Sequence, residues 1–409
     1  MAVRLNNERN NELNSELNKE EESLFVLLRT AMGQKNPDKA ADCSWEKLLD
    51  LARAHAVSAM LYDVLERQPH LPEFVKECVQ KDAQSTVLSG YRLLFLTAYL
   101  TESLKKHGIT AVTLKGAATA AFYPVPEYRK SGDIDLLIVR RADLRRAAAC
   151  LQEDGFRLLP EQPALHHVQL ENGEGISVEL HHSLTEPFEN QKVNAYLNRI
   201  LPEYGRHIVE NQTWGLRLLQ PSDAYHAFYL LVHMLQHFLR EGFGLKNLCD
   251  WTLFWNRDVP TAEKTRFQTL IRESGTAQFV QVVTAVCVKY LGLSGEKAAF
   301  LSYESAREEV VDAFLRDVLE AGEFGRLETD RMVAMQGTGV LAYVQVFQHQ
   351  MHLNYPKAGR VFVCWPVLWI LTLIRFLYNN RRLHRAPVRR IMKKAGRRSQ
   401  LVKQMRLFR

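Results

Sequence analysis

The sequence contains few cysteines, and no two of them lie close together. Six are spread over 409 residues without a C-x-x-C pair: Cys43, Cys78, Cys150, Cys249, Cys287 and Cys364. This spacing suits neither a thiolate zinc cluster nor a dense disulfide framework, so we expect a reducing, cytoplasmic location. The first 23 residues are rich in Asn and Glu and lack the apolar run of a signal peptide. We therefore expect no secretion and a mature chain that begins near Met1.

Two catalytic signatures are also missing. The chain contains neither G-x-x-x-x-G-K-[ST], the phosphate loop of P-loop proteins, nor G-x-S-x-G, the nucleophile turn of many hydrolases. The sequence therefore disfavours a P-loop kinase and gives no support to a serine hydrolase. Any phosphate chemistry must rest on a different glycine turn.

Acidic residues are absent from the end of the chain. Residues 375–409 hold 13 Lys or Arg and no Asp or Glu. The formal net charge is +7, so subtracting these 13 charges leaves −6 for the preceding 374 residues. The basic character belongs to the C-terminal tail, and we expect this tail, rather than the main body, to meet an anionic partner.

Composition divides the chain into five parts. We expect a disordered polar leader over 1–23, a helical segment over 24–107, an α/β core over 108–185, a helical domain over 186–355, and an apolar helix with a basic tail over 356–409. The two helical parts show apolar residues at helical spacing, whereas the central part contains short β-branched runs bounded by glycine.

Strands and a helix alternate in the central part. Ile109–Leu114 and Ile134–Val139 are short apolar runs typical of strands, and Ala142–Glu153 has the pattern of a helix. Val168–Leu170 and Ile176–Leu180 flank a polar, glycine-containing turn and predict a hairpin. The pattern indicates an α/β fold between N- and C-terminal helical segments.

The strongest chemical signal is a pair of aspartates at the start of the second strand. Side chains alternate along a strand, so Asp133 and Asp135 project from one face while Ile134 points to the other. Two carboxylates so placed repel each other unless a cation lies between them. Mg²⁺ suits such oxygen ligands, although D-x-D also occurs by chance at strand starts.

Three neighbouring features favour a site over chance. Lys115-Gly116 ends the first strand where a helix begins, which lets backbone N–H groups and a lysine approach a phosphate. Arg129 is a fork-shaped donor suited to phosphate oxygens. Glu179 lies on a later strand with His181 two residues on and facing the same side, so Glu179 is either a third metal ligand or a general base.

These residues together resemble the nucleotidyltransferase superfamily related to DNA polymerase β, and within it a bacterial branch of uncharacterised nucleotidyltransferases. The resemblance is specific over roughly residues 111–182 and looser elsewhere. The matching motifs are Leu114-Lys115-Gly116, Tyr123-Pro124, Arg129-Lys-Ser-Gly132-Asp133-Ile-Asp135-Leu-Leu137 and Glu179-Leu-His181.

The resemblance implies a small mixed β-sheet core and Mg²⁺-dependent transfer of a nucleoside monophosphate from an NTP, ATP in our interpretation, with release of pyrophosphate. Asp133, Asp135 and Glu179 would hold the metal and carry catalysis. The nucleotide would be bound by Lys115, Gly116, Arg129, Gly132 and His181. The acceptor stays open, and a small molecule or a glycan-linked acceptor fits the class.

A second interpretation keeps the fold without turnover. Most active members of the superfamily carry Gly-Ser or Gly-Gly after the first strand, whereas this chain has Lys115-Gly116-Ala117. A catalytically degenerate protein that binds a nucleotide or a metal would explain this difference. The presence of all three carboxylates argues against it.

His233 and His237 stand four residues apart in a predicted helix, a spacing that zinc sites use. The H-E-x-x-H glutamate is absent, so a polar lining of the substrate cleft, together with Lys246 and Asp250, or ordinary core and surface histidines, fit better than zinc.

The apolar run Val361–Ile374 is 14 residues long, short of the roughly 20 needed to span a bilayer. It is either a buried helix or an interfacial anchor with Trp365 and Trp369 at headgroup depth, followed by a basic tail on anionic lipid. A membrane-surface adaptor, peripherally associated, is thus a further alternative function. Nucleic acid is a weaker candidate partner because no aromatic platform accompanies the arginines.

Overall fold

The computed structural model describes residues 17–34, 43–68, 71–159, 166–323, 361–379 and 388–408, together with six positions between 348 and 358. Most of the predicted polar leader, and the predicted helices between 324 and 347, lie outside the described residues.

A five-stranded mixed sheet forms the α/β core, which confirms the predicted fold class. Its strands are β1 (Ala111–Thr113), β2 (Asp133–Ile138), β3 (Arg157–Leu158), β4 (His167–Glu171) and β5 (Ser177–His181). The strand order is β1-β2-β5-β4-β3, with β2 and β5 parallel and the other pairs antiparallel. The predicted hairpin is the β4–β5 pair, so the polar glycine turn was a correct signal.

The two faces of β2 meet different partners. Ile134, Leu136 and Ile138 point into a small core that lies between the sheet and two helices, α5 (Glu73–Lys106) and α7 (Leu144–Glu153). Leu137, on the opposite face, joins the large core of the helical region. The aspartates share the face of Leu137, and the strand period of two therefore directs them toward the helices.

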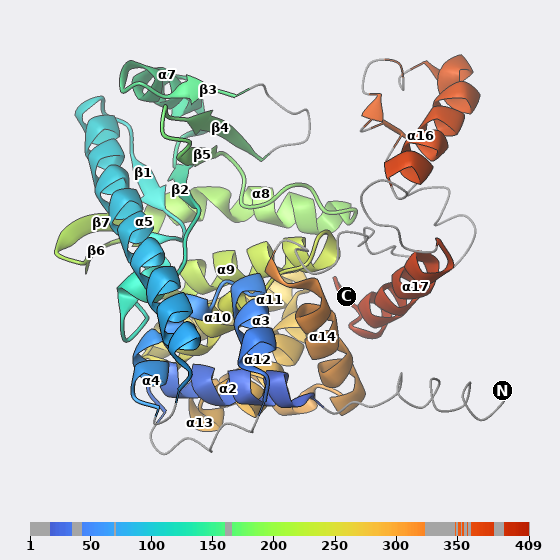
Figure 1. Ribbon diagram of the computed structural model, residues 1–409. Helices are drawn as coiled ribbons and strands as arrows, with labels where there is room; N and C mark the ends of the chain where they lie inside the picture. The colour runs from blue at the N-terminus through green and yellow to red at the C-terminus, as the bar shows by residue number, and fades with distance from the viewer. Residues whose placement is uncertain are drawn as a thin grey trace.

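Helices from both ends of the chain surround the large core (Figure 1). The N-terminal helices are α2 (Lys19–Ala31), α3 (Trp45–Ala54), α4 (Tyr62–Glu66) and α5. The later helices are α8 (Gln191–Arg206), α9 (Asp223–Leu239), α10 (Leu245–Asn256), α11 (Thr261–Ser274), α12 (Ala277–Leu291), α13 (Gly295–Ala298) and α14 (Glu308–Ala321). Nearly every residue of α9 is buried, which makes it the central helix of this bundle.

Helix α5 is 34 residues long and belongs to both cores. Val75 and Val79 near its start lie in the large core, whereas Leu100 and Leu104 near its end lie in the small one. Between them, a Cβ added at Gly90 would lie 3.4 Å from the indole of Trp214, so the helix and the loop approach closely here.

A second, two-stranded sheet was not anticipated from the sequence. Strands β6 (Ile208–Thr213) and β7 (Leu216–Pro221) form an antiparallel hairpin. Its two turn residues, Trp214 and Gly215, both have positive φ (51° and 80°), as a two-residue hairpin turn requires. Tryptophan rarely adopts this conformation, so the turn has no typical sequence signature.

The C-terminal part of the chain contains two more helices, α16 (Trp365–Asn379) and α17 (Val388–Gln404). Helix α17 packs against α14, burying Leu401 and Val402, and the Nε atom of Arg398 lies 3.1 Å from the Asp317 carboxylate. Part of the basic tail is therefore attached to the bundle. Among the described residues, no helix combines the length and the apolar character needed to cross a membrane.

Candidate active site

The parallel pairing of β2 with β5 brings the predicted carboxylates together. Asp135 lies directly opposite Glu179 in the register. One potential ligand atom each from Asp135, Glu179 and His181 lie within 4.8 Å of one another. The Asp135 side chain is fully buried, whereas those of Asp133 and Glu179 are 33% and 18% exposed. Asp133 thus stands at the mouth of the site and Asp135 at its base.

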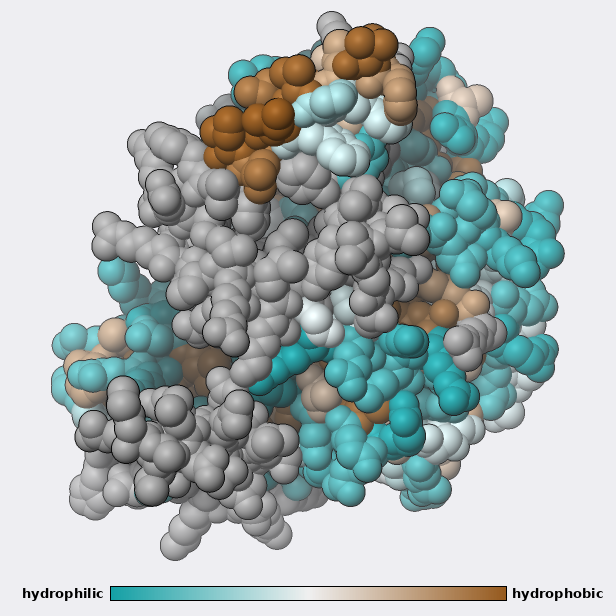
Figure 2. Space-filling model, turned by 90° about the vertical axis from the view of Figure 1, so that its right-hand side faces the viewer, coloured by the Kyte–Doolittle hydropathy of each residue, from teal (hydrophilic) through white to brown (hydrophobic). Residues whose placement is uncertain are grey.

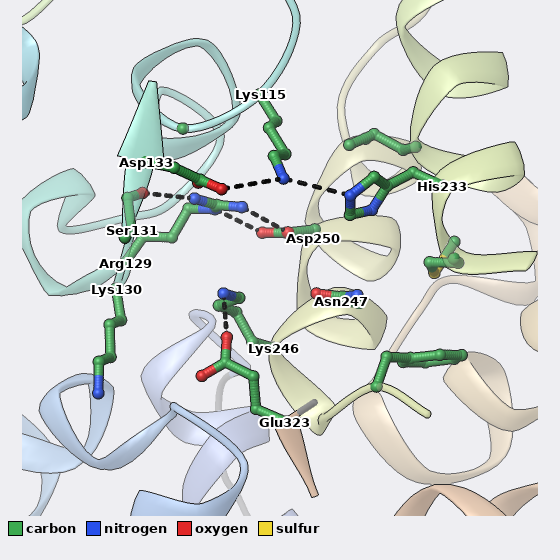
Figure 3. A pocket seen from close by; sticks show the side chains of 15 residues that line it. Lys115, Arg129, Lys130, Ser131, Asp133, His233, Lys246, Asn247, Asp250 and Glu323 are labelled. Atoms are coloured by element: carbon green, nitrogen blue, oxygen red, sulfur yellow. Dashed lines mark hydrogen bonds and ion pairs between the residues drawn. The ribbon is translucent and has the colours of Figure 1, made fainter. Parts of the chain in front are cut away.

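Lys115 lies beside the two aspartates (Figure 3). Its Nζ atom is 3.3 Å from Asp135 Oδ1 and 3.7 Å from Asp133 Oδ2, and it donates a hydrogen bond of 3.2 Å to Nε2 of His233. Burial favours the neutral amine, but the nearby carboxylates outweigh burial and raise the pKa of Lys115 above its usual value. The ammonium group therefore offsets part of the repulsion between the aspartates.

His181 forms a buried link between the two strands. Its Nε2 lies 2.9 Å from Asp135 Oδ1 and 3.4 Å from Glu179 Oε2. Burial alone would lower its pKa, but hydrogen bonds to the two carboxylates raise the pKa to about 9. The same contact with His181 lowers the pKa of Glu179, against the opposing effect of burial. As predicted, His181 faces the same side as Glu179.

Arg129, predicted as a phosphate ligand, is bound to a carboxylate from the helical bundle. Its Nε and Nη2 atoms donate to the two oxygens of Asp250 at 2.7 and 2.8 Å, and Tyr123 donates to the same carboxylate at 2.6 Å. Its remaining nitrogen, Nη1, donates to the Ser131 hydroxyl at 2.8 Å. The guanidinium lines the pocket, but its donors are engaged within the protein (Figure 3).

The glycine turn after β1 is present, but the helix that follows is short. Gly116 has φ +64° and ψ −115°, a conformation that non-glycine residues rarely adopt. The helix predicted to begin after Gly116 is α6 (Ala117–Ala120), a single turn, so it offers little helix dipole to a phosphate. A Cβ built on Gly116 would lie 4.0 Å from the Ser131 hydroxyl, which places a serine beside this turn from another part of the chain.

A known family model, that of an uncharacterised nucleotidyltransferase, matches residues 41–292 of the chain. The chain belongs to this uncharacterised nucleotidyltransferase family. Among curated proteins, none is significantly similar to it. A solved structure, an antigenic nucleotidyltransferase-like protein from Paracoccidioides brasiliensis, aligns with 19% identity over 49% of this chain and 93% of that one, with a TM-score of 0.32.

In this family member, the bundle supplies the far wall of the pocket. This wall faces the start of β2 across the pocket and consists of Lys246 and Asn247 from α10, His233 and Met234 from α9, and Glu323. Lys246 forms an ion pair with Glu323 (Figure 3). The wall thus presents paired charges, and Gly132 and Lys130 complete the opposite rim.

The histidines of α9 take part in the site as polar lining. His237 lies 3.1 Å from His233 through their Nε2 atoms, and its Nδ1 lies 2.8 Å from Glu241. Burial, followed by the positive charge of Lys115, lowers the pKa of His233, which keeps Nε2 free to accept from the lysine. His233 therefore fits the predicted cleft lining, whereas the buried His237 fits the alternative of a core histidine.

Two features of the site escaped the sequence analysis. Ser131 was named only within the motif, because its position beside Gly116 depends on the fold of the Tyr123–Lys130 loop. His166 and His167, next to His181, were not assigned to the site, since the β4–β5 register that aligns His167 with His181 cannot be read from the sequence. An HH pair opposite the E-L-H motif in a hairpin is the signal that could have found them.

Proposed function

We propose that the protein transfers a nucleoside monophosphate from an NTP, with ATP as the expected donor, to an acceptor hydroxyl or phosphate in an Mg²⁺-dependent reaction that releases pyrophosphate. The observation that supports this most directly is the Oδ2 atom of Asp135, which is buried and has no hydrogen-bond partner among the described residues. An unpaired buried carboxylate oxygen is costly, and a cation would satisfy it.

The residues fit a hard divalent cation. Asp135 and Glu179 supply oxygen atoms that lie within 4.8 Å of each other, and Asp133, on the same face of β2, lines the pocket; oxygen is the ligand type that Mg²⁺ prefers. When bound, the ion would neutralise charge on the α-phosphate and orient the attacking oxygen. The lowered pKa of Glu179 supports a role as ligand over that of general base, because a base works best with a pKa near the operating pH.

The triphosphate would lie over the Gly116 turn. Gly116 leaves room for backbone N–H groups to approach, and Lys115 supplies the positive charge. Ser131 accepts from Arg129, so its own hydroxyl proton is free to point elsewhere, toward a phosphate oxygen. We assign to Ser131 the contact that a serine after the glycine makes in other superfamily members. Arg129, and behind it Asp250, would then act by holding Ser131 in place.

Calorimetric binding of a non-hydrolysable NTP analogue with Mg²⁺ tests the proposal. We expect metal-dependent binding to the wild type and none to Asp133→Ala/Asp135→Ala, while Asp258→Asn, a fully exposed aspartate, behaves like the wild type. Binding that ignores the double substitution would refute the site. Binding without any transfer to a panel of sugar, sugar-phosphate and glycan acceptors would instead favour the degenerate interpretation.

A second candidate function, attachment to an anionic membrane surface, is favoured by the surface of α16. Figure 2 shows an apolar patch over this helix. Eight large apolar side chains in and just before it are between 42% and 84% exposed: Val361, Phe362, Val363, Val367, Ile370, Leu371, Leu373 and Ile374. Monomeric proteins rarely expose so many apolar residues in one place. Trp365 and Trp369, which were predicted to lie at headgroup depth, instead contact other residues of the protein. Trp369 donates a hydrogen bond to Gln348, and Trp365 packs on His352.

The charge of the neighbouring tail selects lipid as the occupant. The sequence from 375 onward carries only positive charges, which complement anionic headgroups, while the apolar face of α16 suits insertion at the interface. Sedimentation of the full chain with vesicles of phosphatidylcholine and phosphatidylglycerol tests this. We expect Phe362→Ser/Val363→Ser/Val367→Ser to lose binding and Leu88→Ser, an exposed apolar residue of α5, to retain it. Equal binding of both variants, or binding to single-stranded nucleic acid in place of vesicles, would overturn it.

A further inference from the structure

Three imidazole rings converge behind the carboxylate site. His166 precedes β4, His167 begins it, and His181 ends β5 directly opposite His167. The ring centroids are 4.6, 5.0 and 5.3 Å apart, and one ring nitrogen from each lies within 4.8 Å of the other two. All three side chains are more than nine-tenths buried.

Each ring keeps an unused nitrogen. The Nδ1 atoms of His166 and His181 are buried and have no hydrogen-bond partner among the described residues, and the buried Nδ1 of His167 lies 3.3 Å from Glu179 Oε2 without forming a hydrogen bond. A buried polar atom without a hydrogen-bond partner is costly, so these nitrogens favour a ligand that accepts their lone pairs.

The surrounding carboxylates have the arrangement of an outer shell. A carboxylate only accepts hydrogen bonds, so the contact of 2.9 Å between His181 Nε2 and Asp135 places a proton on Nε2. The Nδ1 atom of His181 is then left for another partner. Metal-binding histidines commonly donate their second N–H to a carboxylate in this way. Glu179 Oε2 lies 3.3 Å from His167 Nδ1, so the carboxylate assigned above to the oxygen site borders the imidazole cluster.

We propose that His166, His167 and His181 form a binding site for a transition-metal ion of the Zn²⁺ class, separate from the oxygen site at Asp133 and Asp135. Imidazole suits zinc, whereas Mg²⁺ prefers oxygen. A tetrahedral zinc with bonds of about 2.0 Å needs ligand nitrogens about 3.3 Å apart, whereas the ring nitrogens here lie within 4.8 Å of one another, so the rings would move together on binding. Binding displaces any proton held by Nδ1 of His181.

The site would join β4 to β5 behind the carboxylates. It would place a fixed positive charge next to Glu179 and hold the strand end on which Glu179 depends. His166 and His167 have no part in the nucleotide site proposed above, whereas His181 and Glu179 belong to it. The two proposals can therefore fail independently when His166 and His167 are substituted.

Titration of the full chain with Co²⁺ tests the site, because Co²⁺ in a tetrahedral imidazole site gives intense visible absorption. The protein is prepared without a histidine tag and stripped with a chelator. We expect one equivalent to bind with this absorption, and His166→Ala and His167→Ala to weaken binding at least tenfold. His107→Ala, which removes an exposed histidine at the end of α5, and Asp133→Asn should leave the titration unchanged.

Circular dichroism of the same samples establishes that the variants are folded, and His166→Gln serves as a second variant if His166→Ala unfolds. Equal binding by wild type and the His166 and His167 variants would overturn the proposal. So would weak absorption typical of octahedral oxygen ligands, or loss of the signal in Asp133→Asn alone, which would assign the ion to the oxygen site.

Discussion

Substituting Arg129 by methionine should destabilise the protein severely. The guanidinium makes a bidentate ion pair with Asp250, and the two side chains are only 4% and 5% exposed. Without Arg129, the Asp250 carboxylate would retain one donor, the hydroxyl of Tyr123. Breaking a buried pair from one side leaves an uncompensated charge, and we expect a loss of about 3–5 kcal/mol in the free energy of unfolding.

A second substitution separates the charge from the packing. Arg129→Met/Asp250→Asn removes the buried negative charge while keeping an acceptor for Tyr123, so we expect at least half of the lost stability to return. Arg140→Met provides the matched control. It removes an arginine–aspartate pair with an arginine that is 67% exposed, and such pairs contribute about 1 kcal/mol or less.

Urea denaturation followed by circular dichroism measures all three variants. If Arg129 were mainly a phosphate ligand, Arg129→Met would lower nucleotide affinity at nearly unchanged stability. A loss below about 1 kcal/mol, or a double variant as unstable as the single one, would refute the structural role that the geometry assigns to this arginine.

Three further predictions concern single residues. Burial lowers the pKa of His55 to about 4. Between pH 4 and 6.5 the unfolded histidine binds a proton and the native one does not. The free energy of unfolding should therefore rise with pH across this window by about 3 kcal/mol. Urea midpoints should show this slope reduced in His55→Asn, which keeps an acceptor for the Leu245 N–H, and an unchanged slope would contradict it. Gly116→Ala should cost about 1–3 kcal/mol in urea denaturation because of its φ of +64°, although the added methyl has room; a neutral result would mean that the backbone relaxes. Lys115→Met should raise the affinity for Mg²⁺ alone about tenfold, measured by calorimetry, because cation repulsion disappears, and should lower the affinity for NTP. A weaker affinity for Mg²⁺ would show that the lysine does not oppose the cation.

The sequence was sufficient for four of the five strands of the central sheet and for the pair of aspartates. The alternation around Ile134 directs apolar side chains to the small core and carboxylates to the other face, and this rule depends only on strand geometry. The glycine turns and helical periodicity likewise identified most elements to within a few residues. Local patterns succeeded wherever local physics sets the structure.

The remainder depends on contacts between distant residues. Arg129 was predicted to bind a phosphate because its fork-shaped guanidinium suits phosphate oxygens. Its pairing with Asp250, 121 residues later, has no signal in the nearby sequence. Ser131 is placed beside Gly116 by the same tertiary packing. The β6–β7 hairpin was missed because its turn uses Trp214, which packs against Gly90 and so owes its conformation to α5.

Helix α5 also constrains how the active-site cleft can move. It runs through both cores, so the sheet that carries Asp133 cannot rotate against the bundle that carries Asp250 without bending this helix. Kinks form preferentially at Gly/Ser pairs, and α5 contains one, Ser89-Gly90, near its middle. The indole of Trp214 lies against α5 at Gly90. Opening and closing of the cleft around a nucleotide would therefore bend α5 at Gly90. The turn of the β6–β7 hairpin would limit how far the helix can bend.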